Sequence, residues 1–284
     1  MAKKRAKRAA VEAEIVADKT KATAAEKSAP PASFWRAQFW PAVGWVVWLA
    51  VAFFAAQIIA AILLLPLQEV GVIDIKQLST LASALIEASL YALILLIAVG
   101  IPLRRARQTD AKSGEKIWSW RSARQAVGLN RQPRWSDLGM TLSNAPMFYI
   151  LVMLVSFAAQ FLLGGGVMSQ EQTLSFATTG NVWWQLIIIF AALVVVAPLA
   201  EEMLMRGFLF AKLRAKLPFW PVAVIVSLLF AVAHWQLNVG IMTFILSMFT
   251  CRMREKTGAI WAGVGLHMVV NLVAFSLRFI FNIG

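Results

Sequence analysis

Two adjacent carboxylates and an arginine interrupt a long apolar stretch of the sequence. Glu201, Glu202 and Arg206 follow a run of aliphatic residues that begins near position 183. Ionisable side chains at membrane depth are costly, so they mark candidate functional positions. Glu202 and Arg206 are four residues apart with the acid first, the favourable order for an ion pair within a helix. Glu201 lies about 100° around the helix from Glu202, so that pair leaves it available for chemistry.

The chain contains only two histidines, and both lie in apolar stretches downstream of these carboxylates. Glu202 and His234 are equally far from Pro218 on either side, so an antiparallel hairpin that turns there brings His234 to the level of the glutamates. His267 and Asn271 are four residues apart, so they share one helical face and can point at one centre. The spacing therefore predicts a polar, hydrated cluster inside the membrane.

Such a cluster has the equipment for peptide hydrolysis by water. A carboxylate and a neutral imidazole can deprotonate a water, alone or with a divalent metal, while a second histidine and an amide donate hydrogen bonds to an oxyanion. The sequence has no Gly-x-Ser-x-Gly or His-Glu-x-x-His motif, and its single Cys251 lies away from the predicted site.

Small and helix-bending residues accompany the polar ones. Pro198 lies four residues before Glu202; it removes a backbone donor, can bend the helix, and leaves carbonyls to be satisfied by water or side chains. We expect Gly263 and Gly265, just before His267, to let another backbone approach closely.

Taken together, these residues resemble a known family. The resemblance is to the CAAX prenyl endopeptidases and their bacterial relatives, the bacteriocin-processing or Abi proteins (CPBP family) of intramembrane proteases. It covers about residues 183–271 and rests on three motifs in order: Glu201-Glu202-x-x-x-Arg206, Phe230-x-x-x-His234 and His267-x-x-x-Asn271.

The resemblance implies an intramembrane endopeptidase that cleaves a membrane-embedded or lipidated peptide or protein. It assigns activation of the attacking water to Glu201 and His234, and stabilisation of the oxyanion to His267 and Asn271. The remaining motif residues are implied to support the site, orient the substrate or pack: Glu202, Arg206 and Phe230.

The cofactor stays open at this stage. Glu201, His234 and His267 carry side chains of the types that ligate zinc or another divalent metal. A buried carboxylate could equally act as the base unaided. We expect the unaided glutamate, because the oxyanion role of His267 and Asn271 leaves too few ligands for a closed metal site.

Composition places the cluster in an all-α, polytopic membrane helix bundle. The 284 residues are 60% hydrophobic, with a mean hydropathy of +0.71, and several apolar runs exceed the length needed to cross a bilayer. We expect about seven transmembrane helices, near residues 40–65, 78–103, 140–163, 183–213, 220–235, 239–253 and 259–281. We further expect a disordered cytoplasmic tail over 1–33, a transmembrane hairpin with a cytoplasmic interfacial loop over 34–139, and the motif-bearing bundle over 140–284.

Basic residues alternate between loops in the positive-inside pattern. They gather in segments 3–36, 104–134, 212–216 and 252–256, whereas the loops between contain only Lys76. This predicts a cytoplasmic N-terminus, in the plasma (inner) membrane if the source is bacterial, and membrane lipids as partners. A nucleic-acid role is disfavoured despite the net charge of +13, because no basic segment has aromatics spaced to stack bases.

Three points are left open by the residues. Glu87, in the second predicted span, could line the same cavity, pair with Arg206, or make a structural hydrogen bond. A non-catalytic membrane scaffold or immunity protein could use the polar cluster for partner binding. A transporter function is less favoured, because the sequence shows no internal repeat. The oligomeric state is not set by the sequence.

Overall fold

The computed structural model describes residues 32–72, 74, 78–104, 120–163 and 183–281. By its internal contacts the chain divides into residues 1–43 and residues 44–284. Residues 1–31 of the predicted disordered tail, residues 105–119 of the predicted interfacial loop and the 164–182 connection lie outside the described residues.

One long helix, from Trp183 to Arg214, carries the two glutamates. It is continuous but not uniform, since two π-helical stretches interrupt it on either side of the acidic pair. Its segments are α9 (Trp183–Phe190), η4 (Ala191–Val196), α10 (Ala197–Glu202), η5 (Met203–Leu209) and α11 (Phe210–Arg214). The first stretch, η4, ends just before Pro198, and π-helical turns occur frequently at functional sites.

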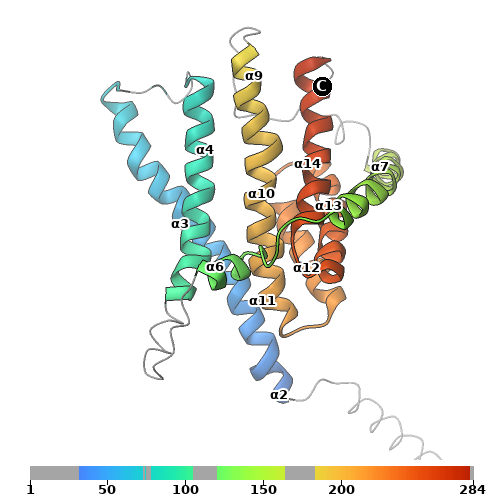
Figure 1. Cartoon of the computed structure of the whole chain (residues 1–284). Coiled ribbons are helices and arrows are strands. Elements are labelled where there is room, and N and C mark those ends of the chain that lie inside the picture. Colours follow the sequence, from blue (N-terminus) through green and yellow to red (C-terminus); the bar gives the residue numbers. More distant parts are fainter. Residues whose placement is uncertain (1–31, 73, 75–77, 105–119, 164–182, 282–284) are drawn as a thin grey trace, which may run out of the picture. The chain divides into compact units, whose positions relative to one another are not determined.

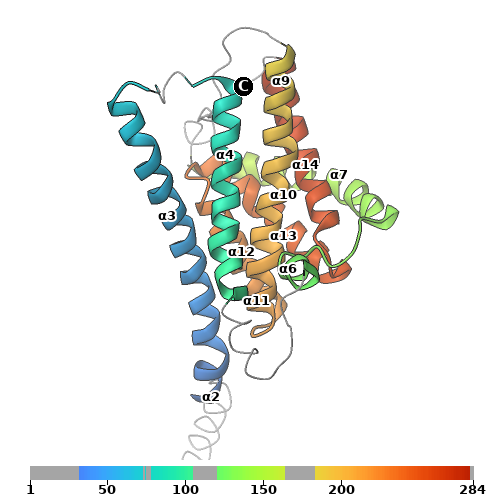
Figure 2. The same ribbon diagram turned by 60° about the vertical axis from the view of Figure 1, so that its left-hand side comes forward.

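The described N-terminal part of the chain is also helical. Its segments are α2 (Ala32–Phe34), η1 (Trp35–Phe39), α3 (Trp40–Glu69), α4 (Thr80–Leu95) and η3 (Leu96–Gly100). The Ser79 side chain caps α4 by accepting from the Ala82 N–H. The Trp48 indole donates to the Ala98 carbonyl at 3.0 Å and joins α3 to η3. In Figures 1 and 2, α4 runs beside α9 and α10.

The C-terminal helices complete the bundle. They are α7 (Trp135–Leu163), α12 (Phe219–Val232), α13 (Leu237–Thr257) and α14 (Trp261–Phe275), followed by η6 (Ser276–Ile280). Pro218 precedes α12 in an extended conformation and forms the predicted turn after α11. Gly258 ends α13 at a φ of 68°, a left-handed conformation that glycine adopts without strain.

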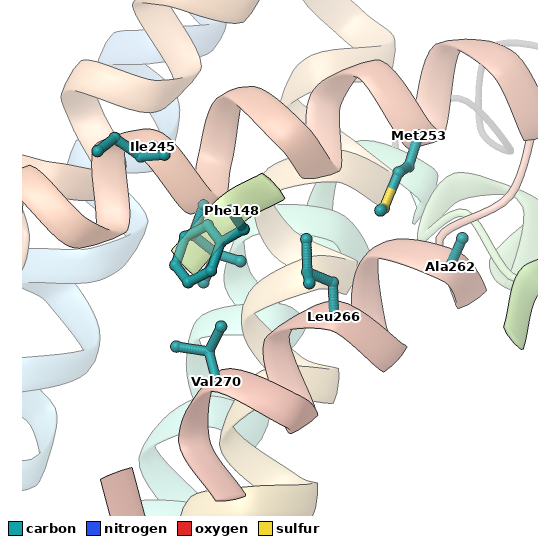
Figure 3. Packing of buried hydrophobic residues seen from close by; sticks show 7 residues of the cluster. Phe148, Ile245, Met253, Ala262, Leu266 and Val270 are labelled. Carbon is teal, nitrogen blue, oxygen red and sulfur yellow. The ribbon is translucent and has the colours of Figure 1, made fainter. Parts of the chain in front are cut away.

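The main hydrophobic core lies where α7, α13 and α14 meet. Figure 3 shows the Phe148 ring of α7 inserted between side chains of the two other helices. The buried members of this cluster are Phe148, Ile245, Leu246, Met253, Ala262, Leu266 and Val270. This core fixes α14, and therefore fixes the helix that carries His267 and Asn271.

The connection between α6 (Trp120–Ala126) and α7 is hydrogen-bonded to the turn between α13 and α14. The Trp261 indole donates to the Arg131 carbonyl at 2.7 Å, and the Asn130 amide donates to the Gly258 carbonyl at 2.6 Å. The described part of the predicted interfacial segment thus contains a short helix, and the residues after this helix are hydrogen-bonded to the rest of the bundle.

Helix lengths refine the prediction of seven spans. Five described helices are long and apolar enough to cross a membrane: Trp35–Glu69, Thr80–Arg104, Trp135–Leu162, Trp183–Arg214 and Trp261–Ile280. The predicted span at 220–235 is the shorter helix α12, and the one at 239–253 is part of α13, whose last turns contain Arg252, Arg254 and Lys256. The fold is a polytopic helical membrane bundle with five such helices.

Candidate active site

The two glutamates of α10 occupy different environments. The Glu202 side chain is completely buried, whereas that of Glu201 retains 18% of its exposure. Successive residues on a helix point about 100° apart, which sends one carboxylate into the bundle and leaves the other at the edge of the polar cluster. Glu201 is therefore the glutamate with room for a water or a substrate.

Glu202 forms the predicted ion pair with Arg206. Its Oε1 lies 3.0 Å from the Arg206 Nη1, and both side chains are fully buried. The guanidinium carbon also lies 4.7 Å from the centre of the Phe230 ring, within cation–π range. Arg206 and Phe230 are equally far from Pro218 in the sequence, so this contact confirms the antiparallel register predicted for the hairpin.

His267 of α14 lies between the two carboxylates. Its Nδ1 is 3.3 Å from the Glu202 Oε1, and its Nε2 is 3.6 Å from the Glu201 Oε2. The ring is almost fully buried and stands edge-on to Phe230, with 5.8 Å between ring centres. This imidazole therefore joins the buried ion pair to the more accessible Glu201.

Asn271 satisfies a carbonyl that the proline exposes. In η4 the Ala197 N–H bonds to the Ala192 carbonyl, five residues back. The next donor in this series would be the N–H of Pro198, which does not exist, so the Leu193 carbonyl needs another partner. The Asn271 side-chain amide donates to it at 2.8 Å. Satisfaction of a freed carbonyl by a side chain was expected, and Asn271 is the residue that provides it.

His234 packs against the Phe230 ring. The chain leaves α12 after Val232, and the His234 Nδ1 is 2.7 Å from the Phe230 carbonyl, with the two rings 4.9 Å apart. Among the described residues, no hydrogen bond or ion pair joins His234 to either glutamate. The structure thus brings Glu201, Glu202 and His267 into direct proximity, and it connects His234 to them through the Phe230 ring.

Tyr91 of α4 is a site residue that the sequence motifs did not indicate. Its hydroxyl donates to the Glu201 Oε1 at 2.5 Å. Glu87 lies one turn earlier on α4, on the same helical face, and its Oε2 is buried without a hydrogen-bond partner among the described residues. One alternative for Glu87 was an ion pair with Arg206. The structure instead pairs Arg206 with Glu202. A signal existed in the spacing Glu87-x-x-x-Tyr91 within an apolar helix.

The two glycines before His267 make room for side chains, where another backbone was expected. A Cβ on Gly263 would lie 3.1 Å from the Glu202 Oε2, and one on Gly265 would lie 2.5 Å from the Thr141 Oγ1. A close backbone approach occurs instead at Gly207, where a Cβ would overlap the carbonyl of Val127. Gly263 therefore belongs to the site, because a larger residue would push against the buried carboxylate.

The metal hypothesis can be compared with the side-chain arrangement. Among the described residues, no three His, Cys, Asp or Glu side chains are grouped as they would need to be to hold a metal ion. Each nitrogen of His267 faces a carboxylate, and His234 is turned toward a backbone carbonyl. The arrangement therefore does not fit the set Glu201, His234 and His267 as ligands of one metal ion.

Comparison with known proteins identifies the segment that carries this site. Residues 182–273 match the family model described as type II CAAX prenyl endopeptidase Rce1-like. No curated protein and no solved structure matches the chain significantly. The matched segment contains Glu201, Glu202, His234, His267 and Asn271, while Tyr91 lies outside it. Residues 182–273 are therefore similar to the type II CAAX prenyl endopeptidase Rce1-like family, and they lie within an integral membrane protein.

Proposed function

We propose that this protein is an intramembrane endopeptidase in which Glu201 is the general base that activates the attacking water. The observation that carries the proposal is the environment of Glu201. It is the most exposed of the charged residues in the cluster, and its Oε2 lies 3.6 Å from the Nε2 of His267. The substrate class implied by the family is a membrane-associated, prenylated peptide or protein.

The two oxygens of Glu201 have separate tasks. Oε1 accepts the hydrogen bond from Tyr91, which fixes the orientation of the carboxylate. Oε2 is left to take the proton of a water as that water's oxygen adds to the carbonyl carbon of the scissile peptide bond. When the tetrahedral intermediate collapses, the C–N bond breaks and Glu201 returns the proton to the leaving amine.

His267 and Asn271 are proposed to stabilise the oxyanion. The Nε2 of His267 lies 3.6 Å from the Glu201 Oε2, and an N–H at this nitrogen could donate to the developing negative charge. The Asn271 amide uses one hydrogen for the Leu193 carbonyl, and its second hydrogen can serve the oxyanion.

His234 is proposed to assist as a second acceptor. A backbone carbonyl accepts and cannot donate, so the Nδ1 that faces the Phe230 carbonyl must carry the hydrogen. The neutral ring then presents a lone pair at Nε2. That nitrogen can share the proton of the attacking water with Glu201 once the water and the substrate are bound.

Glu202 and Arg206 are proposed to hold the site in place and to take no proton. Their fully buried ion pair orients His267 through Nδ1, and the Phe230 ring packs against Arg206 and both histidines. Orientation of a histidine through its second nitrogen is a common way to fix the direction of the first.

The test uses the full-length protein in liposomes and the near-isosteric variant Glu201→Gln. Cleavage of a prenylated peptide that ends in a CAAX sequence is measured against the same peptide without the lipid. We expect the rate to fall by roughly 10²- to 10⁴-fold, the usual contribution of a general base. The matched control is Glu255→Gln, because Glu255 pairs with Arg214 at the protein surface; it should cleave at the wild-type rate.

Two results would contradict the proposal. Wild-type turnover by Glu201→Gln would remove Glu201 from the role of base. The second result concerns protein termini measured by mass spectrometry in membranes from cells that express the wild type or Glu201→Gln. Identical termini in the two membranes would favour the non-catalytic scaffold.

A further inference from the structure

A cavity of about 290 Å³ lies between the first turns of α7 and the last turns of α13, away from the glutamate cluster. Its polar lining includes Arg252 and Lys256 from α13, together with Ser136, Ser143 and Asn144 from α7. Phe249 and Met253 add an apolar wall. Arg252 and Lys256 are one helical turn apart, so both cations reach the same opening.

Among the described residues, no acidic side chain lines this cavity, and the two acidic residues nearest in sequence to its lining are paired elsewhere. Asp137 accepts two hydrogen bonds of 2.6 Å from the guanidinium of Arg131. Glu255 is bound by Arg214 at 2.9 Å. The positive charge of Arg252 and Lys256 is therefore available to an anion, and the hydroxyl of Ser136 can add a hydrogen-bond donor.

The surroundings favour a lipid as the source of that anion. Beyond the cavity, α7 presents a continuous apolar surface, with Met147, Leu154 and Phe157 among its most exposed residues. Trp135, at the start of the same helix, is 85% exposed, and exposed tryptophans gather at the level of the lipid headgroups. An anionic headgroup in the cavity would place its acyl chains along this part of α7.

We propose that the cavity binds the phosphate of an anionic phospholipid. Arg252 and Lys256 neutralise the phosphate, the serine hydroxyl orients it, and the apolar surface of α7 receives the acyl chains. The site stands apart from the proteolytic chemistry and does not depend on it.

The experiment measures lipid retention by the full-length protein in detergent, using native mass spectrometry. The probes are phosphatidylglycerol, phosphatidylcholine and inorganic phosphate. The test variant is Arg252→Gln/Lys256→Gln. The matched control is Arg121→Gln/Lys216→Gln, which removes the same charges from exposed positions that do not line the cavity.

We expect the wild type to bind phosphatidylglycerol in preference to phosphatidylcholine. The cavity variant should lose about a hundredfold in affinity, since two charge-assisted hydrogen bonds are removed, whereas the control should lose less than tenfold. Lys256→Gln alone, at an exposed position, should lose about tenfold and guards against misfolding of the double variant. Failure of inorganic phosphate to displace the lipid at millimolar concentration would support the lipid as the ligand.

Three results would overturn the proposal. Equal losses in the cavity variant and in the control would show general surface attraction. Equal binding of the two phospholipids would show that the charge of the headgroup is not recognised. Binding of inorganic phosphate as tight as that of phosphatidylglycerol would make the ligand a soluble anion.

Discussion

Substitution of Glu202 by Gln offers a strong test of the site, because it removes one charge from a pair that is completely buried. Glu202 and Arg206 are both 0% exposed and lie 3.0 Å apart. The variant keeps the shape of the side chain but leaves the guanidinium without its counter-charge. Breaking a buried ion pair from one side costs about 3–5 kcal/mol, because the remaining charge stays desolvated.

Two features of the structure place the expected loss at the lower end of this range. The Phe230 ring, 4.7 Å from the guanidinium carbon, keeps a favourable contact of up to about 2 kcal/mol with the cation. The Gln amide oxygen also keeps a partial negative charge beside the guanidinium. We therefore expect Glu202→Gln to lower the free energy of unfolding by about 3 kcal/mol.

The double variant Glu202→Gln/Arg206→Met separates loss of the pair from loss of one partner. With both charges gone, no desolvated ion remains, and such replacements are often neutral or stabilising. We expect the double variant to be more stable than the single variant by about 2 kcal/mol. Unfolding is followed by tryptophan fluorescence during denaturant titration in micelles, since the chain has 12 tryptophans.

Surface pairing provides the control. Glu255→Gln breaks the exposed pair with Arg214, whose side chains keep 36% and 39% of their exposure, and should cost less than about 1 kcal/mol. The reasoning is refuted if Glu202→Gln is no more destabilising than this control, or if the double variant is less stable than the single one.

Two further predictions concern the helices that hold the site. Tyr91→Phe removes the hydrogen bond to Glu201. We expect this variant to cleave about tenfold more slowly or worse, with an unchanged free energy of unfolding. A cleavage rate equal to that of the wild type would show that Tyr91 does not position Glu201. Gly207→Ala places a Cβ against the Val127 carbonyl and should lower the free energy of unfolding by about 1–3 kcal/mol. Gly139→Ala is the control: its Cβ meets open space, so it should be neutral or stabilising. Equal effects of the two substitutions would refute the close approach at Gly207.

The sequence was most informative where one helix supplied all the information needed. The Glu202 and Arg206 pair follows from spacing alone, because residues four apart on a helix meet whatever surrounds them. The hairpin register also followed, since Pro218 fixes the turn and equal distances along two helices then set the level. The contact between Arg206 and Phe230 confirms this reasoning at the resolution of one side chain.

Contacts between distant helices were harder to predict. Tyr91 belongs to a stretch whose composition differs little from that of any apolar span, and its role depends on α4 packing beside α10. Likewise, the sequence placed His267 and Asn271 on one helical face, but it did not indicate that the two nitrogens of His267 divide between the two glutamates. Such details depend on tertiary packing, which the period of a single helix does not contain.

The two adjacent glutamates can meet two requirements that conflict under the proposed mechanism. A single carboxylate buried deeply enough to anchor Arg206 and His267 could not also be open to water, since access to water would weaken the ion pair. Placing the acids side by side solves this conflict, because the 100° step of the helix sends Glu202 into the bundle and leaves Glu201 at its edge. Pro198, which precedes the two acids, also affects the orientation of α14. Because Pro198 leaves the Leu193 carbonyl without a backbone donor, that carbonyl accepts a hydrogen bond from Asn271. This bond holds the face of α14 from which His267 reaches Glu201.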